Sequence, residues 1–187
     1  MTPAIKFDHV TFRYAGRKQP CLRNVSFSIA HGETVLLLGP SGCGKSTLAL
    51  CLTGLIPHVV EGELSGSILL NGRDTRSRPL GDTTREVGLL FQDPETQFCM
   101  LRIDDEIAFG MENLRLPRDV MTSRVVTAMR QAGLDRPPAT RIETLSGGDK
   151  QRLALACVLA MEPRVLLFDE PASQLDPRAA RNVVAMM

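Results

Sequence analysis

The sequence predicts an α/β fold that is built around one loop. An apolar run at residues 34–38 has the character of a buried strand, and a second run at residues 48–52 has that of a buried helix. The loop between them follows the pattern G-x-x-x-x-G-K-[ST], which is typical of phosphate-binding loops when a strand precedes it and a helix follows. Its nine residues are Gly39, Pro40, Ser41, Gly42, Cys43, Gly44, Lys45, Ser46 and Thr47.

The residue types in this loop suit a bound polyphosphate. Glycines let the main chain come close enough for its N–H groups to surround the anion, and the following helix directs its positive end toward it. Lys45 can reach the β- and γ-phosphates, and the hydroxyl of Ser46 suits Mg²⁺, a hard cation that prefers oxygen ligands. The alternative is a Gly-rich turn in an unrelated α/β protein, but lysine, hydroxyl, strand and helix in register favour the phosphate loop.

The composition is that of an ordinary globular chain with a single domain. Its 187 residues are 43% apolar and 23% charged, with a net charge of +1, so the overall charge does not favour nucleic acid or an anionic membrane. The five cysteines show no C-x-x-C pair and no metal-ligand spacing, which favours free thiols in a reducing compartment. We find no signal peptide and no stretch near the roughly 20 apolar residues of a membrane span, so we expect membrane association only through a partner.

Strands are predicted on both sides of the loop and its helix. Residues 31–33 predict a turn into the strand before the loop, and residues 67–70 predict a strand that an Asn-Gly turn at 71–72 closes. The polar residues 73–82 contain a proline and predict a loop. Alternation of apolar and polar residues over 5–8 and 10–14 predicts one half-buried strand that ends in a turn at Gly16, and the same alternation recurs at 25–29.

The pattern changes to helix in the middle of the chain. A short buried strand is predicted at 87–91, and Gln92 follows it directly. From residue 93 to about 133 the apolar residues recur at helical spacing, and the acids at 104–106 stand where the first turn of a helix favours them. A second helix at 118–133 would turn three residues inward, Val125, Val126 and Met129.

A further helix and strand are predicted toward the end of the sequence. The helix covers 145–161, with Ser146 as its N-cap and Asp149 in a capping box, where the carboxylate would pair back to the N–H of Ser146. A buried strand at 164–170 ends in two acids, Asp169 and Glu170. A loop and the start of a helix follow at 171–177 and 178–187.

Four motifs in this order resemble those of the nucleotide-binding subunit of an ATP-binding-cassette (ABC) transporter. They are the phosphate loop, Gln92 after its strand, Leu145-Ser146-Gly147-Gly148, and Phe168-Asp169-Glu170-Pro171 followed by Ser173-Gln174-Leu175-Asp176. The resemblance covers nearly the whole chain and implies an ATPase that uses ATP and Mg²⁺. It implies an α/β fold with a P-loop NTPase core of ABC-ATPase type, an N-terminal antiparallel β subdomain and an inserted α-helical subdomain.

The same resemblance implies boundaries inside this single domain of residues 1–187. Residues 1–92 would form the β subdomain and the first part of the nucleotide-binding core. Residues 93–161 would form the helical subdomain with the signature helix, and residues 162–187 the acid-bearing strand, the D-loop and the start of the next helix.

Roles for the polar residues follow from the resemblance and agree with their positions. Asp169 ends an apolar strand, at the edge where α/β sheets bind ligands, and would hold Mg²⁺ together with Ser46. Glu170 would act as general base on the attacking water, Lys45 would bind the phosphates, and Gln92 would contact both metal and water. The alternative for the two acids is a solvated pair at the end of a strand.

The signature motif would act on a second subunit. Ser146, Gly147 and Gly148 would face the γ-phosphate that the partner holds, because a bare helix start suits an anion. Asp149 stands where the family usually has glutamine, and a carboxylate near phosphate is unfavourable unless it points away. Tyr14 would stack on adenine, with a strand-end aromatic that covers the core as the alternative.

One family feature is missing from this sequence. The resemblance places a switch histidine at the end of the strand after residues 178–187, whereas the three histidines are His9, His31 and His58. We therefore expect the C-terminal part of the fold to be missing and this chain alone to turn over ATP poorly.

Residues 92–98 and 106–114 resemble the energy-coupling-factor group of transporters, which includes cobalt and nickel importers. This implies import of a vitamin or metal ion, pairing with a second ABC ATPase subunit or domain, and a place at the cytoplasmic face of the membrane. Gln97, Phe98 and nearby residues would face a transmembrane coupling protein; the alternative is that Phe98 and Met100 are simply core of the helical insertion. The alternatives are another transporter subgroup, a soluble ABC ATPase that acts on nucleic acid or ribosomes, and a module that binds ATP without turnover.

Overall fold

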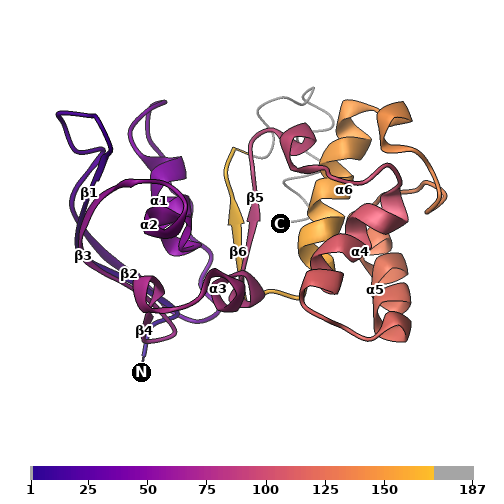
Figure 1. Ribbon diagram of the computed structural model, residues 1–187, viewed down its shortest axis with the longest axis horizontal. Coiled ribbons are helices and arrows are strands. Elements are labelled where there is room, and N and C mark those ends of the chain that lie inside the picture. Colours follow the sequence, from indigo (N-terminus) through magenta and orange to yellow (C-terminus); the bar gives the residue numbers. More distant parts are fainter. Residues whose placement is uncertain (1, 171–187) are drawn as a thin grey trace. The chain divides into compact units, whose positions relative to one another are not determined.

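The computed structural model describes residues 2–170, and the chain divides into two compact units, Met1–Thr84 and Arg85–Met187 (Figure 1). The predicted loop at 171–177 and helix at 178–187 lie outside the described residues. Across residues 2–170 no helix is long and apolar enough to cross a membrane.

An antiparallel sheet forms the frame of the first unit, as the sequence predicted. Alternate side chains of its strands point into the core, where Phe7, Phe12 and Ile68 are almost fully buried. The Asn71-Gly72 turn has positive φ at both residues, 51° and 78°, as a tight hairpin turn requires. The strands lie in the order β2-β1-β3-β4 and are β1 (Ile5–Tyr14), β2 (Leu22–Ile29), β3 (Gly62–Leu70) and β4 (Arg73–Asp74).

Two helices lie against β3 in this unit, α1 (Lys45–Leu52) and α2 (Leu55–His58). The side chains of Cys51, Leu52 and Ile56 are buried in this unit. The helix that the sequence predicted after the phosphate loop is therefore confirmed, and it begins within the loop motif itself.

The predicted loop at 73–82 is wrong in part. The segment contains β4, a 3-10 turn η1 (Thr75–Ser77) and the start of α3 (Leu80–Glu86). Asp74 explains the turn, because its carboxylate accepts the backbone N–H of Arg76 at 2.9 Å and pairs with the guanidinium of the same residue at 2.7 Å. Such short elements depend on polar capping, so no apolar periodicity indicates them.

The predicted buried strand at 34–38 is also wrong. These residues form no strand with β1–β4, and the apolar side chains of Val35, Leu36, Leu37 and Leu38 are 50–80% exposed. An apolar run indicates a preference for burial, but the hydrogen-bond partners that make it a strand come from elsewhere in the chain. The sequence of the run does not specify them.

Two parallel strands lie near the two ends of the described part of the second unit. The pair is β5 (Val87–Leu90) and β6 (Val165–Phe168), joined in register. The strand predicted at 87–91 is confirmed, and Val87 and Leu90 are buried. The strand predicted at 164–170 is present as β6, but the prediction that it is buried is wrong. None of its four residues is buried, and Leu166 is 41% exposed. In the described residues β6 pairs with β5 alone.

Three helices lie side by side in the second unit and enclose one apolar core (Figure 1). Ile103, Ile107, Met111 and Leu153 are fully buried in it. This is the helical subdomain that the sequence predicted. Its elements are η2 (Pro94–Gln97), α4 (Ile103–Asn113), α5 (Arg118–Gln131), η3 (Ile142–Thr144) and α6 (Gly147–Ala160).

One residue of α5 that was predicted to face the core is exposed instead. Val125 and Met129 are buried as expected, but Val126 is 61% exposed. The buried positions of α5 include Ala128, so the inward face follows the spacing i, i+3, i+4 from Val125. Val126 is one position, about 100° of rotation, away from that face.

Candidate nucleotide site

The phosphate loop lies in the first unit, and the backbone conformation of Gly44 favours glycine there. Gly44 has φ +106°, which L side chains rarely adopt, and a Cβ at this position would lie 2.8 Å from the side chain of Leu22. A Cβ on Gly39 would lie 2.6 Å from the sulfur of Cys43, so the side chain of Cys43 would have to shift.

Lys45 and Ser46 begin the helix that follows the loop. The Nζ of Lys45 donates to the carbonyl oxygens of Gly39 and Pro40, at 3.0 and 3.3 Å, so its charge lies across the loop. Ser46 is exposed in the first turn of α1, at the end where the helix dipole favours an anion. The loop thus combines a helix start, an ammonium group and a hydroxyl.

Tyr14 lies next to this loop. Its hydroxyl forms a hydrogen bond of 2.9 Å with the hydroxyl of Thr47, and the sulfur of Cys21 lies 3.3 Å from the same oxygen. The ring of Tyr14 stands edge-on to that of Phe12, with centroids 4.8 Å apart. The side chain of Thr47 is therefore turned into the protein, and it ties the predicted adenine-binding aromatic to the loop.

Gln92, Asp169 and Glu170 come to one edge of the parallel strands in the second unit. Leu90 lies opposite Phe168, and the pairing continues as the N–H of Asp169 donates to the carbonyl of Leu90 at 2.9 Å. Because the strands are parallel, the residues that follow them emerge at the same edge. Glu170 has φ 48°, and such strained backbone in a residue with a side chain is concentrated at functional sites.

The predicted signature helix begins as expected. Ser146 is the N-cap of α6, and its hydroxyl accepts the N–H of Asp149 at 3.2 Å. A Cβ on Gly147 would meet no atom within 4 Å, whereas one on Gly88 of β5 would lie 2.5 Å from Val158 of α6. The start of the helix is therefore open, while its body is fixed closely against the strand.

Asp149 does not complete the predicted capping box. In the described part of the chain its carboxylate accepts from two arginines rather than from the N–H of Ser146. Arg136 donates from Nε and Nη2 to Oδ2, at 3.1 and 2.8 Å, and Arg152 donates to Oδ1 at 3.3 Å. Burial is the largest single influence and raises the pKa of Asp149, but the hydrogen bonds from Arg136 and Ser146 and the charges of Arg136 and Arg152 together outweigh it, so the pKa lies below its usual value. A guanidinium offers two parallel donors with full charge, which a single backbone N–H does not.

A buried glutamate shapes the segment between η2 and α4. Oε2 of Glu106 accepts the backbone N–H groups of Cys99 and Met100, at 2.9 and 2.6 Å, and Glu106 is only 6% exposed. Phe98 packs against the helical core, whereas Leu101 is 70% exposed. The segment is therefore held from inside and presents an apolar side chain outside.

The side chains predicted to hold magnesium carry oxygen donors of the kind that this cation prefers. They are the hydroxyl of Ser46 in the first unit and, in the second unit, the carboxylate of Asp169 and the amide of Gln92. Magnesium is usually bound by one or two protein groups together with phosphate oxygens, so these residue types fit it. Over residues 2–170 no three His, Cys, Asp or Glu side chains gather to hold a metal ion.

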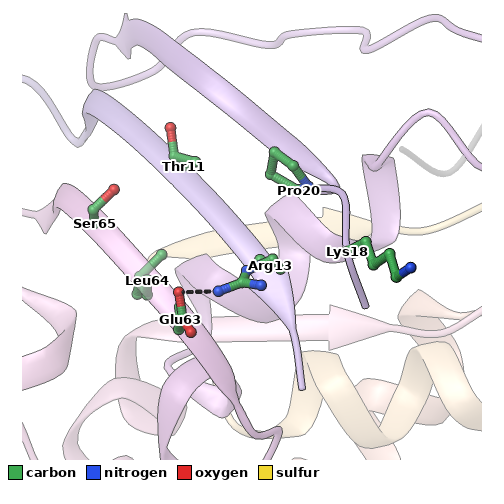
Figure 2. Close-up of a pocket in the computed structure, with 7 residues that line it drawn as sticks. All are labelled: Thr11, Arg13, Lys18, Pro20, Glu63, Leu64 and Ser65. Atoms are coloured by element: carbon green, nitrogen blue, oxygen red, sulfur yellow. Dashed lines mark ion pairs between the residues drawn. The ribbon is translucent and has the colours of Figure 1, made fainter. Parts of the chain in front are cut away.

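A separate pocket of about 440 Å³ opens on the sheet of the first unit (Figure 2). Arg13 and Glu63 form an ion pair of 2.6 Å inside it. Arg13 precedes Tyr14 on β1, and successive side chains of a strand point to opposite faces, so the pocket opens away from the face of Tyr14. No predicted site residue lines it; the lining residues are Thr11, Arg13, Lys18, Pro20, Glu63, Leu64 and Ser65.

Sequence reasoning missed two residues that support these sites, Arg136 and Glu106. Arg136 lies in a loop with no periodic pattern, and the signal for it was indirect, since a carboxylate at position 149 needs a cation nearby. Glu106 is one of three acids in a first helical turn, where acids are expected to be solvated. Its burial depends on backbone groups of a loop, which no spacing rule identifies.

A phosphate loop that opens a helix, together with an acidic edge on a parallel strand pair, defines a nucleotide-binding protein of the P-loop class. Comparison with known sequences specifies the family: the profile described as ABC transporter matches residues 22–173. The chain belongs to the ABC transporter family and is an ATP-binding domain of it, the part that makes these proteins ATPases.

Similar sequences agree with this assignment. YkoD of Bacillus subtilis, named as an HMP/thiamine import ATP-binding protein, is 46% identical over 181 residues, which are 96% of this chain and 33% of YkoD. An ABC transporter ATP-binding protein of Pyrococcus horikoshii is 41% identical over 183 residues, which are 98% of this chain and 64% of that protein. The chain thus spans about a third of one relative and less than two thirds of the other.

Solved structures show the same fold. The structure of cbiO1 from Clostridium perfringens, part of the ABC transporter complex cbiONQ, matches this chain with a TM-score of 0.84 and 30% sequence identity. The match covers all of this chain and 72% of the cbiO1 chain. A bacterial Atm1-family ABC exporter with ATP bound matches this chain with a TM-score of 0.80 and 30% sequence identity. The match covers all of this chain and 32% of the exporter chain. The predicted ABC-type fold is therefore confirmed.

Proposed function

We propose that this domain binds MgATP on its phosphate loop and hydrolyses it between two ATPase domains, and that this powers import across a membrane. One domain would supply the loop and the second the start of its α6. The observation that carries the proposal is the loop itself, where the Nζ of Lys45 lies across the carbonyls of Gly39 and Pro40 at the start of α1. A nucleotide phosphate is the ligand that this arrangement suits.

Each polar residue has one task in this proposal. Lys45 and the loop N–H groups balance the charge of the phosphates, and Ser146 of the second domain faces the γ-phosphate. Glu170 orients the attacking water and accepts its proton, and Gln92 contacts the same water from the same sheet edge. The chemistry is thus positioning and charge balance, with no covalent intermediate on the protein.

The remaining contacts would hold the two ends of the nucleotide. Tyr14 stacks on adenine, and its hydrogen bond to Thr47 links that contact to the loop. When bound, Mg²⁺ would be held by Ser46, Asp169 and Gln92 and would offset the charge of the phosphate oxygens.

Sequence and comparisons together support import through a transporter of the energy-coupling-factor type. Residues 92–98 and 106–114 resemble that group, the solved relative cbiO1 is part of cbiONQ, and YkoD is named for import of HMP or thiamine. The domain would dock on a transmembrane coupling protein at the cytoplasmic face of the membrane, through the segment around Phe98. The exposed Leu101 on a segment fixed by Glu106 suits such a contact.

The second candidate function is export, because the solved structure of an ABC exporter has the same fold as this chain. Reconstitution of the complete transporter in vesicles decides between them. ATP-driven movement of labelled HMP, thiamine or cobalt(II) toward the side of the membrane that holds the ATPase would support import. Movement of a solute only in the opposite direction would contradict it.

The variant Glu170→Gln tests the ATPase part of the proposal in the full-length protein. We expect MgATP binding to persist while hydrolysis falls by about 100-fold or more, because a general base contributes on that order. The ATP-bound dimer should then accumulate on size-exclusion chromatography. Glu143→Gln is the matched control, since Glu143 is an exposed carboxylate of the same unit paired with Arg141. Hydrolysis at the normal rate by Glu170→Gln would remove Glu170 from its role.

A further inference from the structure

A charged cluster lies beside the start of α6, where the proposed function places a phosphate. Asp149 sits in the first turn and is only 6% exposed, and its own N–H is bound by the hydroxyl of Ser146. Arg136 reaches it from the loop after α5 with half of its side chain exposed, and Arg152 reaches the other oxygen from one turn further along α6. The carboxylate is therefore held by two cations, one on each of its oxygens.

An unpaired carboxylate at this position would oppose a phosphate. In the first turn it suits the helix dipole, but it competes with any second anion for the same positive end. Two like charges near a helix start repel with little screening when one of them is buried. The two hydrogen bonds from Arg136 to Oδ2 make Asp149 one half of a neutral pair. The N–H groups of Gly147 and Gly148, which precede the first helical hydrogen bond, then remain available to an anion.

Arg152 does not suffice on its own. It makes a single contact of 3.3 Å to Oδ1, whereas Arg136 makes two contacts to Oδ2, at 3.1 and 2.8 Å. Arg152 also points back from within α6, while Arg136 comes from a different segment and fixes the helix start against the loop after α5.

We propose that Arg136 is a positioning residue for the ATP-bound dimer: it neutralises the carboxylate of Asp149 and so lets the start of α6 accept the phosphate held by the second domain. The inference rests on the proposed function and adds to it a residue outside the ABC motifs. Arg136 acts through Asp149 and contacts no nucleotide itself.

The test compares four forms of the full-length protein: wild type, Arg136→Gln, Asp149→Gln and the double variant. ATP-dependent dimerisation is measured by analytical ultracentrifugation, and MgATP affinity by titration of the dissociated domain. We expect Arg136→Gln to weaken dimerisation about tenfold, which lies within the range of effects that a partly buried charge at a helix end exerts. Asp149→Gln should restore it in the double variant and be near wild type alone. The affinity of the phosphate loop should not change, because α6 acts on the nucleotide of the other domain.

Each result decides the inference. Normal dimerisation by Arg136→Gln, or a double variant as weak as Arg136→Gln, would overturn it and leave the proposed function intact. If Arg136→Gln is unstable, Arg136→Lys decides: it keeps the charge, so near-normal dimerisation supports the role and a tenfold loss overturns it. A wild-type protein that shows no ATP-dependent dimer would overturn the proposed function, and this inference with it.

Discussion

The buried carboxylate of Glu106 offers a quantitative prediction about the segment that leads into α4. Replacing it by alanine removes the acceptor of two backbone N–H groups, those of Cys99 and Met100. A hydrogen bond to a charged group contributes roughly 1.5–3 kcal/mol, and donors left without a partner add to the loss. Because both bonds share one oxygen, we expect a total loss of about 3–4 kcal/mol for Glu106→Ala. Glu106→Gln keeps an acceptor without the charge and should lose about 1–2 kcal/mol.

Thermal unfolding and hydrogen exchange measure these effects. A loss of 3–4 kcal/mol lowers the unfolding midpoint of a chain of this size by roughly 6–15 °C. The amides of Cys99 and Met100 should exchange faster than those of the α4 interior. Glu112→Ala is the control, because Glu112 lies exposed on the same helix. An unchanged midpoint in Glu106→Ala, or a loss equal to that of the control, would refute the reasoning.

Three further predictions concern packing, an ion pair and thiol reactivity. Gly66→Ala should lose about 2–4 kcal/mol in urea unfolding, since φ is +84° there and a Cβ would lie 2.5 Å from a carbonyl oxygen of β1; a neutral effect would contradict this. Lys150→Met should lower the free energy of unfolding by no more than about 1 kcal/mol, because the partner carboxylate of Glu95, 2.7 Å from Nζ, is 62% exposed. A double-mutant cycle with Glu95→Gln should give an equally small coupling energy, and a larger one would contradict this. Peptide mapping after alkylation at pH 8 should find the exposed Cys43 labelled in the free protein and less labelled when MgATP is bound. Cys51 should stay unlabelled, because burial raises the pKa of its thiol to about 12, and equal labelling of the two cysteines would contradict this.

Features with local causes were predictable from the sequence. The phosphate loop needs glycines, a lysine and a hydroxyl at fixed spacing, and the cap of α6 needs only Ser146 one residue before the helix. The hairpin at Asn71-Gly72 follows from the backbone conformations that these two residues tolerate. In each case the interacting groups lie within a few residues of one another, so spacing is enough to identify them.

Features that depend on distant partners were not predictable. Residues 34–38 are as apolar as a buried strand, yet pairing and burial require a neighbour that the run does not encode. Asp149 shows the same limit at a functional position. Its capping box was expected from local spacing, but a guanidinium 13 residues away in the sequence is a stronger partner for a buried carboxylate than a backbone N–H.

The titration of MgATP into the chain and into its Lys45→Ala variant tests most directly whether the loop at residues 39–47 is the nucleotide site. Lys6→Ala is the control, since Lys6 is a surface lysine of the same unit that pairs with Asp8. The wild type and the control should bind with equal affinity, and Lys45→Ala should bind at least about 100-fold more weakly, because it removes a charge-assisted contact to phosphate. Near-normal binding by Lys45→Ala would contradict the assignment of the phosphate loop.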